Sequence, residues 1–168
     1  MTKMVKNKKS SKAKTLPVRN TVRAVIYRRT EQGYDFLLLY KVGTKNYWQN
    51  PQGGQKRGEG PLEALLRESE EETGIPRSSL ELINSTEVKK EYITLRRGTK
   101  TKVNLTAYAV KVNGVHQIKL SKEHNNFKWV SYDKARLTMG KYQEQIQVFD
   151  EICKELFYQH FMRKSRLE

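Results

Sequence analysis

The sequence predicts an α/β fold in which helices pack on a mixed β-sheet. Segments rich in β-branched and aromatic residues are typical of strands, and they occupy residues 20–29, 34–42, 80–96, 102–112 and 127–132. Two segments have the spacing of apolar residues expected of helices, residues 61–73 and 143–161. The chain order is strands, helix, strands, helix, which indicates a sheet covered by helices. At 168 residues the chain has the length of a single domain.

Turns and helix ends support these elements. The first two strands are joined by the turn TEQG at residues 30–33, and the third and fourth by the basic loop RRGTK at residues 96–100. The first helix starts at Pro61, which suits a first helical turn, and stops before Gly74, which suits a C-terminal cap. The last helix is amphipathic, with apolar residues at Ile146, Phe149, Ile152, Cys153, Leu156 and Phe157. Cys153 is expected to fill the core, because free cysteine is commonly buried.

The charge of the chain is strongly positive and unevenly distributed. The formal net charge is +15, which attracts anionic partners such as nucleotides and nucleic acids. Six lysines precede Pro17, and the first acid is Glu31. We expect a disordered basic arm at residues 1–16, a folded domain at 17–160 and a basic tail at 161–168. The arm could solubilise the protein or contact RNA, and lysine without interleaved aromatic residues favours the first role.

Cysteine content and hydropathy bear on the compartment. A single cysteine cannot form an internal disulfide, which suits a reducing compartment, and we expect a cytoplasmic protein. No apolar run approaches the roughly 18 residues that span a membrane. The first residues lack the apolar core of a secretory signal, while their basic, acid-free composition leaves a mitochondrial targeting segment open.

A glycine-rich loop stands directly before an acid-rich helix. The loop YWQNPQGGQKRGEG at residues 47–60 has four glycines, and PLEALLRESEEETGI follows it. At 100° per residue, one helix face is suited to the core: Leu62, Leu65, Leu66 and Ser69. Another face is acidic: Glu68, Glu71 and Glu72. Like charges at this spacing cost a helix about 0.2–0.5 kcal/mol per pair, and a divalent cation bound by their oxygens reverses that penalty. An ordinary solvated face is the alternative.

The loop and helix together resemble the Nudix box, whose pattern is G-x5-E-x7-R-E-U-x-E-E-x-G-U, where U is aliphatic. Eight positions match: Gly53, Glu59, Arg67, Glu68, Glu71, Glu72, Gly74 and Ile75. Ser69 is the one departure, because the family has an aliphatic residue there. Because Ser69 lies on the predicted core face, this departure is expected to affect packing more than chemistry. The chain is thereby identified as a member of the Nudix hydrolase superfamily.

This resemblance implies a fold and a metal site. The family fold is an α/β/α sandwich around a mixed β-sheet, and the family reaction is hydrolysis of a diphosphate linkage with Mg²⁺ or Mn²⁺. The metal-binding glutamates of the family correspond to Glu68, Glu71 and Glu72. A backbone carbonyl near Gln52 or Gly53 often adds a ligand. The glycines of the loop allow the main chain to approach metal and phosphate closely.

The resemblance also implies which residues support and drive the reaction. Arg67 and Glu59 correspond to residues that brace the loop against the helix. A carboxylate takes the proton of the attacking water as general base. In many members the base, or a further metal ligand, lies on a late loop. Residues 120–135, LSKEHNNFKWVSYDKA, resemble that segment, and they nominate Glu123. Glu71 is the alternative base.

Substrate choice in the family depends on residues outside the box. Residues 34–54 and 120–135 resemble segments of asymmetric diadenosine tetraphosphate hydrolases, and the form WQ-x-PQGG also occurs in RNA 5′-pyrophosphohydrolases. Positive charge for a phosphate chain is available from Lys41, Lys56, Arg57, Lys89 and Lys90. A base could stack on Tyr47, Trp48 or Tyr92. If Ile93 and Leu95 enter the core, strand alternation turns Tyr92 away from it.

The expected activity is hydrolysis of a bis(5′-nucleosyl)-tetraphosphate, with diadenosine tetraphosphate giving ATP and AMP. One alternative is an RNA 5′-pyrophosphohydrolase or decapping enzyme, which the basic arm favours. Another is a nucleoside or dihydroneopterin triphosphate pyrophosphohydrolase. A non-catalytic Nudix module that binds RNA or a nucleotide is the alternative outside enzymes, although no box glutamate is lost. We expect as partner a nucleotide substrate with a polyphosphate chain, no membrane, and a monomer or homodimer, with RNA contact as the alternative role of the arm.

Overall fold

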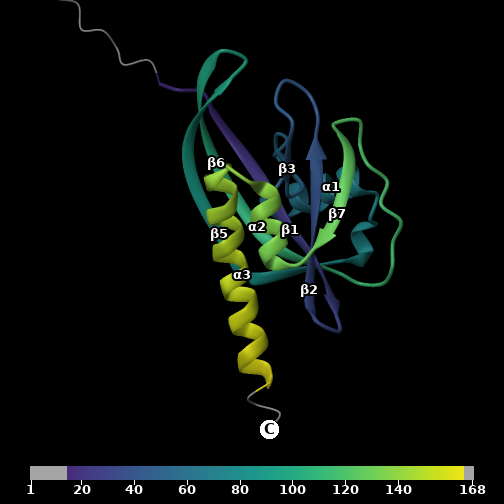
Figure 1. The fold of residues 1–168 in the computed structure, drawn as a ribbon. Helices are drawn as coiled ribbons and strands as arrows, with labels where there is room; N and C mark the ends of the chain where they lie inside the picture. The colour runs from purple at the N-terminus through teal and green to yellow at the C-terminus, as the bar shows by residue number, and fades with distance from the viewer. Residues whose placement is uncertain (1–14, 165–168) are drawn as a thin grey trace, which may run out of the picture.

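The computed structural model describes residues 15–164 and contains a seven-stranded sheet with helices on both faces (Figure 1). The strands are β1 (Val18–Thr30), β2 (Gly33–Lys41), β3 (Tyr47–Gln49), β4 (Gln52–Gly54), β5 (Leu80–Arg96), β6 (Thr99–Val112) and β7 (His124–Val130). The helices are α1 (Pro61–Thr73), the short 3-10 helix η1 (Arg77–Ser79), α2 (Tyr132–Met139) and α3 (Gln143–Lys164). Most of the predicted arm and the last four residues of the predicted tail lie outside the described residues. No helix among residues 15–164 is long and apolar enough to cross a membrane.

The sheet is mixed, as predicted. Its order is β3-β2-β1-β6-β5, with β4 paired to β1 and β7 to β2. The pair β1–β6 is parallel, and the other pairs are antiparallel. β1 shares one edge between two partners, because Val22 lies opposite Gly53 of β4 and Tyr27 lies opposite Phe36 of β2. The glycine-rich loop is therefore attached to a central strand.

Each face of the sheet has its own apolar core. The face under α1 buries Val22, Ala24, Ile26, Leu37, Leu39, Ala64, Leu65 and Ile75, among others. The face under α2 and α3 buries Val25, Tyr27, Phe36, Leu38, Leu105, Phe149, Ile152, Cys153 and Leu156, among others. Successive residues of β1 enter opposite cores, since strand side chains alternate. This confirms the α/β/α sandwich. Cys153 is buried as predicted, and burial raises the pKa of its thiol.

Helix α1 begins and ends where the sequence predicts. Pro61 occupies its first turn, and Gly74 caps its end at φ 70° with its N–H donating to Glu70 O at 2.8 Å. The prediction that Leu62 enters the core is wrong, because that side chain is 40% exposed. Ser69 is buried, and its hydroxyl donates to Leu65 O at 2.7 Å. A backbone carbonyl thus satisfies the hydroxyl that replaces the aliphatic residue of the family pattern.

The outer part of β5 differs from the strand alternation expected of it. Ile93 and Leu95 are 62% and 70% exposed, whereas Tyr92 packs against the core under α3. The cause is a β-bulge between Ile83 and Val88, where the register of β5 against β6 shifts. Across this shift β5 advances by five residues and β6 by two, and the odd number of extra residues in β5 reverses which side chains face inward. Elsewhere the strand predicted at residues 127–132 is β7, which ends at Val130, and Tyr132 already belongs to α2.

Candidate active site

Arg67 is the centre of a hydrogen-bond network that joins the glycine-rich loop to α1. The residue is 7% exposed. Its Nε and Nη2 donate to the two carboxylate oxygens of Glu59 at 2.7 and 2.8 Å. Its Nη2 also donates to Gly54 O at 3.0 Å, and its Nη1 donates to Glu68 at 2.6 Å and Glu71 at 3.1 Å. Five N–H groups are available in a guanidinium, and five contacts occupy them.

Glu59 in turn closes the loop on itself. Its carboxylate accepts from the backbone N–H of Lys56 at 2.9 Å, and its own N–H donates to Lys56 O at 3.1 Å. Gly58 takes φ 81° in this turn, a conformation that favours glycine. The hydrogen bonds from Arg67 and then from Lys56 N lower the pKa of Glu59 to about 2. Glu59 is therefore a structural anion that fixes the loop.

Glu68 lies directly against the glycine of the box. A Cβ placed on Gly53 would stand 1.9 Å from Glu68 Cδ, so the glycine is needed for this approach. Glu68 therefore lies beside the loop backbone, and the carbonyl-plus-carboxylate pair proposed for a metal can form here.

Glu72 is the buried acid of the helix. It is 6% exposed, and it accepts from the backbone N–H of Gln52 at 3.1 Å. Burial is the main cause that raises its pKa to about 8, with Glu68 and Glu123 adding to the rise and the Gln52 N–H opposing it. Three carboxylates thus act on one another within one small region.

Glu71 differs from the other two box glutamates. Its side chain is 51% exposed, and it contacts Arg67 and Lys56 Nζ, the latter at 3.7 Å. It stands at the rim, outside the cavity that Glu68 and Glu72 line.

Glu123 comes to the site from the loop before β7. Its carboxylate pairs with Lys41 Nζ at 3.0 Å, and this lysine lowers the pKa of Glu123. The backbone O of Glu123 accepts from Val42 N at 3.0 Å. The next residue, His124, is buried and lies 3.2 Å from Gln49 Nε2. These contacts fix the loop over the end of β2.

A cavity of about 350 Å³ joins these groups. It is lined by Glu68 and Glu72 of α1, Gln52, Gly53 and Gly54 of β4, Glu123 with Lys41, and Arg19, Thr21, Tyr92, Thr94, Leu95, Arg96 and Val103 of the sheet. One part of the lining is therefore acidic and another is basic.

The donor set fits a divalent cation, although the side chains are not gathered around one point. Within residues 15–164, no three His, Cys, Asp or Glu side chains stand close enough to hold an ion as they are placed. Glu68 and Glu71 are both turned toward Arg67. Carboxylate oxygens with a backbone carbonyl are the ligands that Mg²⁺ prefers. A cation bound beside Glu72 would favour the ionised form of this carboxyl group, whose pKa is raised by burial and by Glu68 and Glu123.

The structure brings Lys41 and Tyr92 to the cavity, and it places the other predicted substrate residues elsewhere. Trp48 packs against Tyr40 and under Lys128. Tyr47 contacts Tyr142. Lys90 pairs with Glu151 of α3 at 2.6 Å, and Lys89 with Glu87 at 3.2 Å. Lys56 and Arg57 lie in the exposed turn outside the lining.

Two arginines of the lining were not predicted. Arg19 is half-buried at the start of β1, and burial followed by the charge of Arg96 lowers its pKa. Arg96 ends β5, in the basic loop that the sequence shows but does not assign to the site. No pattern in the sequence predicts that these two arginines are neighbours, because they are 77 residues apart. They come together because β6 pairs with both β1 and β5.

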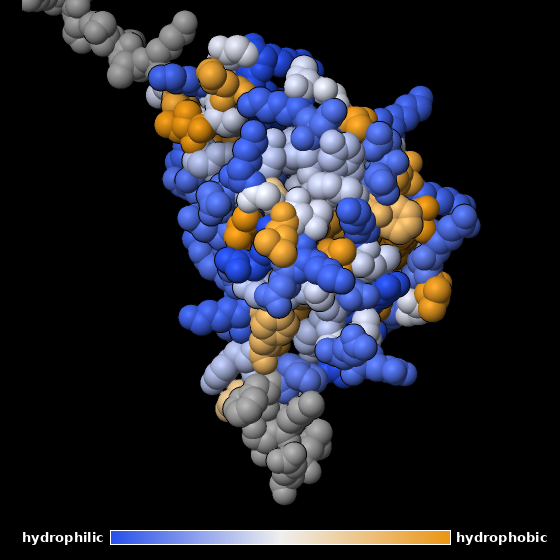
Figure 2. Space-filling model, viewed as in Figure 1, coloured by the Kyte–Doolittle hydropathy of each residue, from blue (hydrophilic) through white to orange (hydrophobic). Residues whose placement is uncertain are grey.

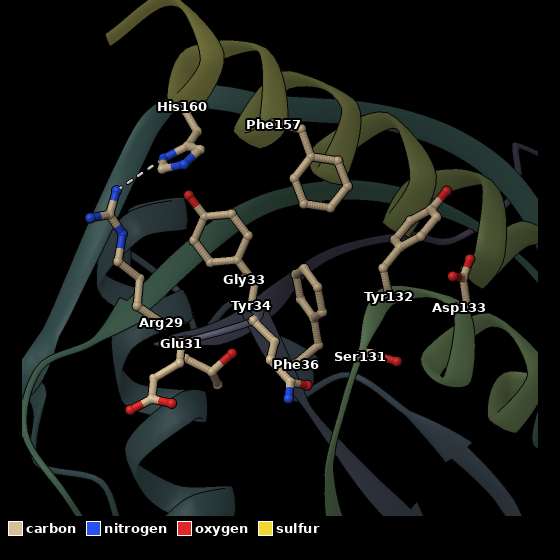
Figure 3. Close-up of a pocket in the computed structure, with 12 residues that line it drawn as sticks. Arg29, Glu31, Gly33, Tyr34, Phe36, Ser131, Tyr132, Asp133, Phe157 and His160 are labelled. Carbon is tan, nitrogen blue, oxygen red and sulfur yellow. Dashed lines mark hydrogen bonds between the residues drawn. The ribbon is translucent and has the colours of Figure 1, made fainter. Parts of the chain in front are cut away.

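A larger cavity lies apart from the carboxylates of the Nudix box. It has about 590 Å³ and lies between the β1–β2 turn and the beginning of α2, with the last turns of α3 beside it. Figure 3 shows the rings of Tyr34, Tyr132 and Phe157 around it, with Arg29 bonded to His160 at one side. No residue of the Nudix box lines it. The smaller cavity is therefore the candidate active site.

Comparisons with known proteins identify the family of the chain. The profile of the NUDIX domain matches residues 17–151, and the chain belongs to this family. The mouse protein bis(5′-nucleosyl)-tetraphosphatase [asymmetrical] is 33% identical over 113 residues, 67% of this chain and 75% of its own length. The RNA pyrophosphohydrolase of Saccharophagus degradans is 41% identical over 61 residues, 36% of each chain. The crystal structure of a C. elegans Ap4A hydrolase binary complex has a TM-score of 0.71 and 26% identity, covering 82% of this chain and 97% of that chain.

Proposed function

We propose that this protein hydrolyses the phosphate chain of a bis(5′-nucleosyl)-tetraphosphate, with diadenosine tetraphosphate giving ATP and AMP. The observation that carries the proposal is the shared cavity, where the box carboxylates Glu68 and Glu72 lie with Lys41 and with the ring of Tyr92. A dinucleoside polyphosphate needs these three features, namely a metal–diphosphate site, cationic contacts and an aromatic surface for a base. The likeness to asymmetrical tetraphosphatases supports it.

We propose Mg²⁺ or Mn²⁺ as the cofactor, held by Glu68, Glu72 and the carbonyl of Gly53, with Glu71 able to join from the rim. When bound, the ion neutralises charge on the phosphate oxygens and lowers the pKa of a water. Glu68 and Glu71 would exchange their hydrogen bonds to Arg67 for the ion. The Glu59–Arg67 pair keeps the loop and helix in place during that exchange.

Glu123 is proposed as the general base that takes the proton of the attacking water. It lines the cavity with Glu68 and Glu72, whereas Glu71 lies outside the lining and contacts Arg67 and Lys56. The ion pair with Lys41 orients the carboxylate of Glu123 and keeps it deprotonated. Tyr92 is proposed to contact a base of the substrate.

An RNA 5′-pyrophosphohydrolase is the second candidate. It is favoured by the likeness to the Saccharophagus protein and by Arg96, which lines the cavity at the end of β5. A 5′-triphosphorylated RNA would present its triphosphate to the same carboxylates.

A product assay separates these candidates. The protein would be incubated with Mg²⁺ or Mn²⁺ and with diadenosine tetraphosphate, 5′-triphosphorylated RNA or dATP, and products identified by chromatography. Release of ATP and AMP with the highest kcat/KM supports the first proposal. Faster release of pyrophosphate or phosphate from RNA would replace it with the second. Absence of turnover on all substrates would favour a binding module.

The single buried cysteine supports our proposal of a reducing compartment, the cytoplasm.

A further inference from the structure

We propose that Arg19 and Arg96 form an anion-binding subsite for the phosphates that lie beyond the cleaved linkage. The ligand class is a chain of three or more phosphates. This inference rests on the proposed hydrolysis at the same cavity, and it adds two residues that select long phosphate chains.

The sheet register places both arginines on the cavity side. Arg19 of β1 lies opposite Val103 of β6, and Val103 lies opposite Tyr92 of β5. Paired residues of neighbouring strands point to the same face, so Arg19 and Tyr92 belong to one row. Arg96 follows Tyr92 by four residues on the same strand, and side chains at even spacing share a face. All four residues line the cavity.

Arg19 also reaches the glycine-rich loop. A Cβ on Gly54 would lie 2.9 Å from its Nη2, so the guanidinium lies directly against the backbone of this glycine. Gly54 is next to Gly53, where the carboxylate of Glu68 lies. The arginine subsite therefore adjoins the proposed metal–diphosphate site without overlapping it.

Neither arginine has a counter-ion in the described part of the chain. Within residues 15–164, no side-chain hydrogen bond and no ion pair within 4.0 Å involves the guanidinium of Arg19 or of Arg96. The buried arginines Arg23 and Arg67, by contrast, are both paired with carboxylates. Two nearby like charges repel each other, and an anion bound between them relieves that repulsion. Figure 2 shows hydrophilic side chains over most of the visible face, so a hydrophilic surface alone marks no site. The distinguishing feature of this subsite is that Arg19 is half-buried beside Arg96.

The other charged side chains of the cavity are poorly suited to bind these phosphates. Lys41 is already paired with Glu123, and the acids Glu68 and Glu72 repel a phosphate chain that carries no metal. Attraction for the phosphates beyond the cleaved linkage must therefore come from the arginines. A guanidinium suits this role, because its planar donors match phosphate oxygens two at a time.

Calorimetric binding of inorganic tripolyphosphate, with EDTA present, tests the subsite directly. We expect Arg96→Ala and Arg19→Ala to weaken binding roughly ten- to hundredfold, since each removes charged hydrogen bonds. Lys100→Ala is the matched control, because it removes one positive charge from the same hairpin but lies outside the lining. It should change binding by less than about twofold. Equal weakening in all three variants, or none in the arginine variants, would overturn the proposal.

Two further measurements separate a ligand role from a structural one. The melting temperature of Arg96→Ala should stay equal or rise, because a like-charge contact is removed; a fall would identify a structural residue, and Arg96→Lys would then test binding in a folded protein. With diadenosine tetraphosphate, Arg96→Ala should raise KM with little change in kcat. If the wild type cleaves none of the tested substrates, the proposed function fails, while the tripolyphosphate result still decides the subsite.

Discussion

Arg67 donates two parallel hydrogen bonds to the carboxylate of Glu59, at 2.7 and 2.8 Å, across the junction of the glycine-rich loop and α1. The same guanidinium holds Glu68 and Glu71, which are two of the proposed metal ligands. The buried guanidinium of Arg67 thereby fixes both the conformation of the loop and the positions of the Glu68 and Glu71 carboxylates.

Replacement of Arg67 by Met is expected to destabilise the fold. It removes the donor to the carbonyl of Gly54 and leaves Glu59 with the N–H of Lys56 alone, and losses of this kind cost on the order of 1–3 kcal/mol. Urea denaturation would measure the loss in the free energy of unfolding. Arg57→Met is the control, because Arg57 is exposed in the neighbouring turn and has no hydrogen bond with residues 15–164. Similar stability of the two variants would contradict the proposed role of Arg67.

Stability should depend on pH through Glu59. Its pKa is about 2 in the folded protein and 4.5 in its ordinary state, so the folded state binds fewer protons between these values. The stabilisation is complete above about pH 4.5 and is lost as pH falls toward 2. Glu59→Gln should therefore flatten the dependence of the unfolding free energy on pH in this window. An unchanged slope, measured by urea denaturation at several pH values, would count against the assignment.

The substitution Glu72→Gln should lower turnover without unfolding the protein. The amide keeps the shape of the buried side chain, and its oxygen can still accept from Gln52 N. We expect a melting temperature within a few degrees of the wild type and turnover lower by at least about a hundredfold, because a metal ligand is lost. Glu63→Gln, an exposed substitution in the first turn of α1, should leave turnover unchanged. Turnover near the wild-type value in Glu72→Gln would exclude this residue from the metal site.

A methyl group at Gly53 should displace Glu68. The added Cβ would lie 1.9 Å from Glu68 Cδ, so the side chain has to move away from the loop carbonyl. We expect Gly53→Ala to lower kcat by roughly tenfold or more, because small displacements of catalytic groups have large effects. Gly60→Ala is the matched control, since nothing lies within 4 Å of its Cβ position and its φ is −75°. Equal kcat in the two variants would show that the approach of Glu68 to Gly53 is unimportant.

The general base can be identified by comparing Glu123→Gln with Glu71→Gln. If Glu123 takes the proton, its removal should lower kcat by roughly 10²–10⁴-fold and abolish the acidic limb of the pH profile of kcat/KM. Glu71→Gln should retain that limb, because Glu71 stands outside the cavity lining. The opposite pattern would assign the base to Glu71.

The sequence shows which residues form the site when their spacing along one segment carries the signal. Gly53, Glu59, Arg67 and the box glutamates lie within 20 residues, and one loop followed by one helix places them together. The positions of Pro61 and Gly74 likewise predict the limits of α1, because capping depends on local backbone geometry. Glu123 was found through a resemblance of its flanking segment.

Only the tertiary structure decided which side chains from distant segments are buried and which are exposed. Glu71 and Glu72 are adjacent and chemically identical, yet packing of α1 on β4 buries Glu72 and leaves Glu71 at the rim. The bulge after Ile83 turns Tyr92 inward and Ile93 outward, which strand alternation alone cannot reveal.

The pairing of Arg19 with Arg96 depends on β6 lying between β1 and β5. Local geometry is encoded in neighbouring residues, so the sequence by itself determined the Nudix box, its helix and the mixed α/β fold. Burial and charge proximity arise from contacts between strands far apart in the chain, so only the folded sheet decided which acids and which cations share the cavity.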